Sequence, residues 1–136
     1  MAAVEGGDLE VLKWVIAAGC PWDDQSCPTA ALHGHLHILQ WLREQGRPWG
    51  KFNTACTMAA WKGHLDVLKW AREEGCPWNY LTVSHAAWGG HIECVKFARD
   101  EGCEWNLAAC VGAARGGHLE MLKYLVDNGC PISVDK

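Results

Sequence analysis

Residues 63–78 read Gly-His-Leu-Asp-Val-Leu-Lys-Trp-Ala-Arg-Glu-Glu-Gly-Cys-Pro-Trp, and the chain of 136 residues contains five edited copies of this phrase. Successive copies are 27, 29, 27 and 27 residues apart and begin at Gly7, Gly34, Gly63, Gly90 and Gly117. A second glycine always follows 12 residues after the first. Self-similarity at a nearly fixed period of this size predicts a solenoid, in which stacked copies of one small unit share a continuous core.

Each copy of the phrase has the pattern of an amphipathic helix. In the fourth copy the apolar residues Ile92, Val95 and Ala98 recur at helical spacing, and charged residues fill the opposite face. The closing glycine suits a left-handed C-terminal cap, and in four copies a proline two residues later prevents the helix from continuing. At the start, Asp8 and the histidines that share its place in the other copies are expected to act as N-terminal caps.

A shorter segment rich in small residues precedes four of these helices, at 27–33, 56–62, 83–89 and 110–116. Each segment holds a pair of alanines, which predicts a short first helix that packs closely on its neighbours. The expected fold is therefore an all-α, helix-turn-helix solenoid of about four and a half units. We expect a single domain over residues 1–136, with repeats at about 1–22, 23–49, 50–78, 79–105 and 106–132, which is either a fragment or a short relative of a longer array.

The repeated core Ala-Ala-x-x-Gly-His-Leu-Glu-x-Leu-Lys resembles the ankyrin repeat, and the resemblance covers residues 2–132. Two features depart from the family pattern. The Thr-Pro-Leu-His that precedes the alanine pair is missing, and each unit is about six residues shorter than the usual 33. The missing residues are those of the β-hairpin, so the chain is most similar to the short form of the repeat, rich in tryptophan and cysteine, that occurs in large DNA viruses, algae and oomycetes.

Composition argues against several classes of partner. The net charge is −4 and no block of Lys or Arg occurs, so a nucleic-acid partner is not expected. No apolar run approaches the length of about 18 residues that predicts a membrane-spanning helix, and the N-terminus lacks the pattern of a signal peptide. The eight cysteines follow the repeat and include no Cys-x-x-Cys pair, which indicates free thiols in the cytoplasm or nucleus.

Neither a catalytic site nor a cofactor or metal site is expected. The serines lie at positions 26, 84 and 133, and none stands beside a histidine and an acid in a plausible nucleophile turn. The column formed by Cys20, Cys76, Cys103 and Cys130 cannot close on one zinc ion, because successive units are about 8–10 Å apart and Zn–S bonds are about 2.3 Å long. The histidines at 33, 35 and 37 span a turn, where their rings are expected to diverge. A small-molecule substrate is not expected either.

Most tryptophans follow the repeat and are interpreted as packing residues. One column holds Trp22, Trp49, Trp78 and Trp105, and another holds Trp14, Trp41 and Trp70 and continues as Phe97 and Tyr124. Replacement of one ring by another is typical of packing between units.

Two other columns, at the end of the first helix, differ in chemistry from unit to unit. Because packing positions repeat and free positions do not, these columns are candidate contacts for a partner protein: Leu32, His33, Trp61, Lys62, Trp88 and Arg115. The ankyrin resemblance implies that they lie on the concave face. Their alternative role is packing of Trp61 on Trp88.

The predicted function is thus non-catalytic binding of a protein partner. The alternatives are a structural spacer within a longer repeat protein and a thiol-based metal or redox sensor.

Overall fold

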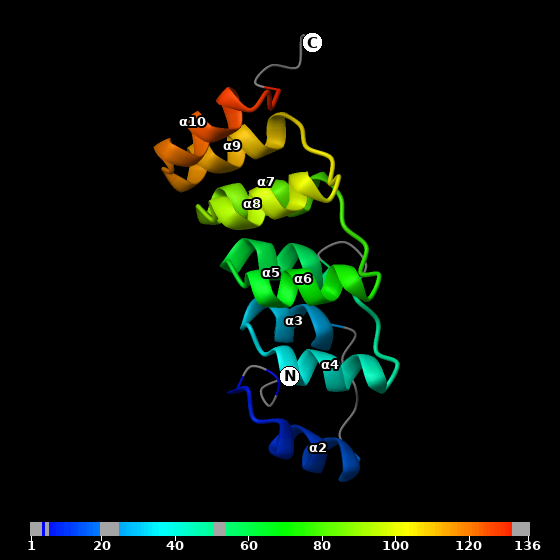
Figure 1. The fold of residues 1–136 in the computed structure, drawn as a ribbon. Coiled ribbons are helices and arrows are strands. Elements are labelled where there is room, and N and C mark those ends of the chain that lie inside the picture. Colours follow the sequence, from blue (N-terminus) through cyan, green and yellow to red (C-terminus); the bar gives the residue numbers. More distant parts are fainter. Residues whose placement is uncertain (1–3, 5, 20–24, 51–53, 132–136) are drawn as a thin grey trace.

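The structure, a computed structural model, describes residue 4 and residues 6–19, 25–50 and 54–131. Nine helices and no strand are defined within these residues: α2 Leu9–Ala17, α3 Ser26–Leu32, α4 Leu36–Glu44, α5 Ala55–Lys62, α6 Leu65–Glu73, α7 Tyr80–Gly89, α8 Ile92–Asp100, α9 Leu107–Gly116 and α10 Leu119–Asp127. From α3 to α10 they form four pairs, each of a first and a second helix. The pairs follow α2 and are stacked in chain order (Figure 1). The predicted all-α helix-turn-helix solenoid is confirmed.

Left-handed glycines end both helices of a unit. Gly63 follows α5 with φ +77, and Gly75 follows the end of α6 with φ +88. Beyond Gly75, the Cys76 N–H donates to the Ala71 carbonyl over 2.9 Å, which satisfies one of the orphan carbonyls of the last turn. The predicted role of the closing glycines as C-terminal caps is therefore confirmed.

The helix starts follow the prediction only in part. The Asp8 side chain accepts from the Val11 N–H over 3.2 Å, as expected of an N-cap. The histidines in the same column make no capping bond, so their predicted role is wrong. Their rings reach back to the preceding unit instead, where His64 Nε2 donates to the Leu32 carbonyl over 3.1 Å.

The first helices α7 and α9 begin three residues before the predicted segments. Asn79 and Asn106 cap them, because their side-chain oxygens accept from the Leu81 and Ala108 N–H groups over 2.9 and 2.8 Å. With these asparagine caps, the first helices of both units are longer than predicted by almost one turn.

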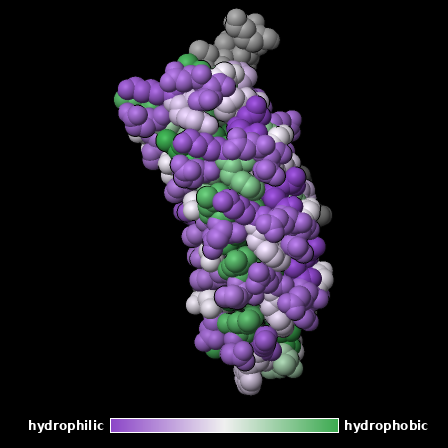
Figure 2. Space-filling view, viewed as in Figure 1, coloured by the Kyte–Doolittle hydropathy of each residue, from purple (hydrophilic) through white to green (hydrophobic). Residues whose placement is uncertain are grey.

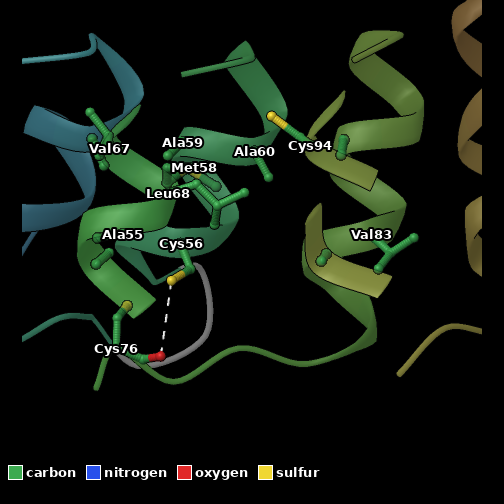
Figure 3. Close-up of a cluster of buried hydrophobic side chains, with 14 of the residues drawn as sticks. Ala55, Cys56, Met58, Ala59, Ala60, Val67, Leu68, Cys76, Val83 and Cys94 are labelled. Carbon is green, nitrogen blue, oxygen red and sulfur yellow. Dashed lines mark hydrogen bonds between the residues drawn. The ribbon is translucent and has the colours of Figure 1, made fainter. Parts of the chain in front are cut away.

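Small residues hold the first helices together. Ala59 and Ala60 of α5 are fully buried, and so are the equivalent alanines Ala86 and Ala87 of α7. In Figure 3, Ala60 of α5 lies between the second-helix side chain Leu68 and the neighbouring helix that carries Val83. Because an alanine side chain is a single methyl group, adjacent first helices can approach one another closely.

The first helices lie closer together than the second helices do. Successive first helices contact one another along most of their length, from α3 to α5, α7 and α9, whereas the second helices α6 and α8 touch at few points. The first helices thus form one side of the stack, its inner face. The second helices form the outer side.

Three arginines hydrogen-bond to the loops that follow the second helices. Arg72 Nη1 donates to the Cys76 carbonyl over 2.6 Å, and its guanidinium lies 4.2 Å from the centre of the Trp78 ring. The same arrangement occurs with Arg99 and Trp105, and with Arg43 and Trp49. This pairing was not predicted from the sequence.

The tryptophan columns pack between units, as predicted. Trp49 meets the Trp70 of the next unit edge-to-face at 5.9 Å, and Trp78 meets Phe97 at 6.0 Å. Trp14 departs from this pattern and is 72% exposed, because no described unit precedes it. Trp22 and Cys20 lie outside the described residues.

Charged side chains cover the outer side. Lys96 pairs with Glu93 at 3.7 Å and Lys123 with Glu120 at 3.9 Å, and all four side chains are exposed, so these pairs contribute little to stability. The face seen in Figure 2 is mostly hydrophilic, with hydrophobic residues in small separate patches. In the part of the chain that the structure describes, each helix is too short or too polar to cross a membrane.

We predict that Gly63→Ala destabilises the fold more than Gly75→Ala. Both glycines are left-handed, so both changes carry the backbone strain of about 1 kcal/mol. A Cβ at Gly63 would also lie 2.5 Å from Nδ1 of the His91 ring, whereas one at Gly75 meets nothing within 4 Å. The additional loss from overpacking is expected to be about 1–3 kcal/mol.

Urea unfolding followed by circular dichroism measures both free energies of unfolding. Equal losses in the two variants would show that the contact between the histidine ring and the glycine does not contribute.

Candidate functional site

The six candidate contact residues all lie on the first helices or directly after them. Leu32 ends α3 and is followed by His33, Trp61 and Lys62 end α5, and Trp88 and Arg115 lie near the ends of α7 and α9. Leu32 and Trp61 are half-buried, and the other four side chains are exposed. The structure therefore places them at the ends of the first helices, on the inner face.

Trp61 and Trp88 form an aromatic cluster with His85. The two indole rings stack with centroids 5.1 Å apart and an angle of 17° between their planes. The His85 ring stands edge-on to both, at 5.9 Å from each, and Lys62 Nζ lies 4.5 Å from the Trp61 ring centre. The packing of Trp61 on Trp88 that the sequence left as an alternative is thus present, yet Trp88 remains 43% exposed.

His85 was not among the predicted site residues. Its Nδ1 donates to the Leu81 carbonyl of its own helix over 2.9 Å, which holds the ring against the two indoles and leaves Nε2 as an acceptor in the neutral ring. The sequence carries a signal for it, because His85 lies three residues before Trp88 and so on the same helix face. The column of His85 also varies between units, as Thr29, Met58, His85 and Gly112.

A hollow of about 710 Å³ opens between α7 and α9 beside this cluster. Its walls include the side chains of Tyr80, His85 and Trp88 from α7 and of Leu107, Val111 and Arg115 from α9. The volume lies within the range of about 300–1,000 Å³ that is typical of ligand sites.

Gly112 explains why the hollow occurs in this unit. It occupies in α9 the position that His85 occupies in α7, so no side chain stands there to fill the space. Its Cα also lies close to α7, because a Cβ at this position would be 2.6 Å from the Ser84 carbonyl oxygen. One glycine thus both permits the approach of the two helices and leaves the surface between them open.

The variable column that holds His33 and Lys62 is constrained by packing at its other two positions, Gly89 and Gly116. A Cβ at Gly89 would lie 2.2 Å from the Trp61 carbonyl oxygen, and one at Gly116 would lie 2.3 Å from that of Trp88. Packing therefore requires glycine at these two positions. The case for His33 and Lys62, which share this column, then rests on their exposure and not on the variation.

The described cysteines are buried. All seven described cysteines are free, and burial raises the pKa of Cys27 and Cys94 to about 11 and that of Cys103 to about 12. Their weak S–H bonds go to backbone carbonyls, as from Cys56 to Cys76 over 3.9 Å in Figure 3. Protonated, buried thiols are poor nucleophiles.

The histidines at 33 and 35 do not diverge as predicted. Their rings stack with centroids 6.0 Å apart and an angle of 15° between their planes. Within the described ranges, no group of three or more His, Cys, Asp or Glu side chains is placed to hold a metal ion.

His91 links the aromatic cluster to the next unit. Its ring lies against Gly63, and it hydrogen-bonds to the Trp61 backbone. Burial lowers the pKa of His91 below its ordinary value, and the nearby His118, His64 and Lys62 add to this effect. The neutral ring is therefore the form that fits the folded stack.

Comparison with known proteins gives one family. Residues 27–72, from α3 to α6, match the family model described as ankyrin repeats (many copies). A search of the curated proteins finds no match.

We predict that the fold loses stability as the pH falls from about 7.5 to about 5.5, and that His91→Gln reduces this loss. The folded pKa of His91 is lower than its unfolded value of 6.5, so its contribution is complete above that value and is lost as the pH falls through the folded pKa.

Urea midpoints at the two pH values measure the effect. His37→Gln, at an exposed histidine, is the control and should keep the parent dependence. An unchanged pH dependence in the His91 variant would contradict the assignment.

Proposed function

We propose that the chain is a non-catalytic module that binds a protein on the face formed by its first helices, because residues 27–72 match the model of the ankyrin repeat, and ankyrin repeats are generally protein–protein interaction modules. The observation that carries the proposal is the exposed ring of Trp88 beside an open hollow with Arg115 on its wall. Tryptophan and arginine are enriched among the residues that dominate binding energy at protein interfaces.

The arrangement of the inner face supports this function. The Trp88 ring is held by Trp61 and His85, so little conformational freedom would be lost when a partner covers it. The hollow beside it offers apolar walls from Leu107 and Val111. The six predicted contacts at 32, 33, 61, 62, 88 and 115 follow one another across four units, which suits a segment that lies along the stack.

Three further properties of the chain follow from the proposed function: its lack of catalytic activity, its compartment and its division into repeats. We infer that it has no catalytic activity, because proteins with ankyrin repeats typically have none and burial raises the pKa of the Cys27 thiol to about 11. Free cysteines at all seven described positions favour a reducing compartment, the cytoplasm or nucleus. We also propose that residues 1–136 form one domain of five repeats.

We predict that a lysate of the source cell contains a protein that the chain captures through the inner face. The parent chain, an inner-face variant with Trp61→Ala, Trp88→Ala and Arg115→Ala, and an outer-face control with Lys96→Ala and Lys123→Ala would serve as baits. The expected result is a protein held by the parent and the control and lost by the inner-face variant. Its identity would come from mass spectrometry.

A second variant keeps this experiment decisive if the triple variant unfolds. Lys62→Ala with Arg115→Ala changes only exposed side chains, and circular dichroism would verify that its helices are retained. If all baits hold the same proteins, or none holds any, the inner face is not the binding site and a structural spacer becomes the better explanation.

A further inference from the structure

We propose that the inner face takes an extended acidic segment of a partner protein, with a bulky apolar side chain seated in the hollow beside Trp88. This inference rests on the proposed function and specifies the chemistry of its partner. It follows from the distribution of charge over the two sides of the stack and from the positions of the two inner-face cations.

Acidic and basic residues are divided unequally between the first and second helices. The four first helices contain no Asp or Glu, and their only Lys or Arg residues are Lys62 and Arg115. Each of the five second helices contains at least one acidic residue. In the part of the chain that the structure describes, the first helices therefore carry only positive formal charges, although the net charge of the chain is −4.

The two cations of the inner face are available to a partner. Arg115 is exposed, and its side chain makes no hydrogen bond or ion pair with any described residue. Lys62 is exposed and rests on the Trp61 ring, an arrangement that still leaves its ammonium hydrogens for a carboxylate. By contrast, Arg43, Arg72 and Arg99 of the second helices already donate to backbone carbonyls.

The hollow lies between these cations along the stack and has apolar walls. Leu107, Ala108 and Val111 line it from α9, and Trp88 and Tyr80 line it from α7. No acidic residue is among the side chains that line it. An apolar side chain would remove these walls from water, while Arg115 at the same site would pair with a neighbouring carboxylate.

The spacing of the units sets the expected pattern of the segment. Lys62 and Arg115 are two units apart, which corresponds to roughly 20 Å at about 8–10 Å per unit. An extended chain advances about 3.3 Å per residue, so two acidic residues about five or six positions apart would reach both cations. The apolar anchor is expected between them, nearer the residue that pairs with Arg115.

A protein segment fits these features better than a nucleic acid. Binding of a phosphate backbone needs many cations in a row, and the inner face offers two. The stacking of Trp61 on Trp88 also covers one face of each ring, which reduces the surface on which bases would stack.

A peptide array tests the proposal without knowledge of the natural partner. Its twelve-residue members carry one Leu or Phe and two flanking residues that are Glu, Gln or Lys, at every spacing. We expect the parent chain to bind members with Glu on both sides of the anchor, more weakly at high salt. Fluorescence anisotropy then gives dissociation constants for the tightest member against charge-reversed variants.

Lys62→Glu with Arg115→Glu should weaken this binding by about tenfold or more. Lys96→Glu with Lys123→Glu, which changes the net charge equally on the outer side, should alter it by less than about twofold. Circular dichroism would verify the fold of both variants, whose substituted side chains are exposed.

Several outcomes would overturn the proposal. Binding of Gln- or Lys-flanked peptides in preference to Glu-flanked ones, tighter binding of a twelve-nucleotide oligo(dT), or unchanged binding by the inner-face variant would each do so. If neutral peptides bind and Trp61→Ala with Trp88→Ala abolishes that binding, the module function stands and only the acidic partner is wrong. If no peptide binds but a captured protein is lost with the inner-face variant, the same conclusion holds.

Discussion

The close packing of successive first helices through their alanine pairs is the interaction on which the rest of the structure depends. Ala59, Ala60, Ala86 and Ala87 are fully buried. A larger side chain at any of them would separate two helices that contact one another along most of their length. Because the second helices have bulkier side chains and stay farther apart, the close approach is confined to one side of the stack, its inner face.

The candidate site follows from the same constraint. Once the alanines face the neighbouring helices, the residue at the end of each first helix projects from the inner rim, and in two units this residue is a tryptophan. The distance between units then brings Trp61 and Trp88 into contact, while Gly112 removes the side chain that would fill the next gap. The open hollow is therefore a local consequence of one glycine in a regular stack.

Histidine contacts between units involve the backbone of two candidate site residues. His64 and His91 hydrogen-bond to the backbone of Leu32 and Trp61 in the preceding unit. Two of the predicted site residues therefore serve in the core of the stack through their carbonyls and at its surface through their side chains. A substitution that removes only the side chain, such as Trp61→Ala, leaves these backbone contacts in place.

Much of the fold could be predicted from the sequence, because five copies of one phrase average out local ambiguity. The Gly63 and Gly75 caps, the helix pairs and the tryptophan columns all follow from patterns of short range. The histidine and arginine contacts could not be predicted, since His64 and Arg72 bond to atoms whose positions depend on stacking and on the link. The hollow beside Gly112 could not be predicted either, because it forms where a side chain is absent and no sequence motif corresponds to it.

Photo-crosslinking from matched positions tests the central claim, binding at the inner face, most directly. A benzophenone amino acid would replace Val111, which lines the hollow and is 40% exposed, or Val126 of α10, which is 44% exposed and lies on a second helix. Inner-face binding predicts a protein crosslinked from position 111 in cell lysate and little or none from position 126. Crosslinks from position 126 alone would contradict it.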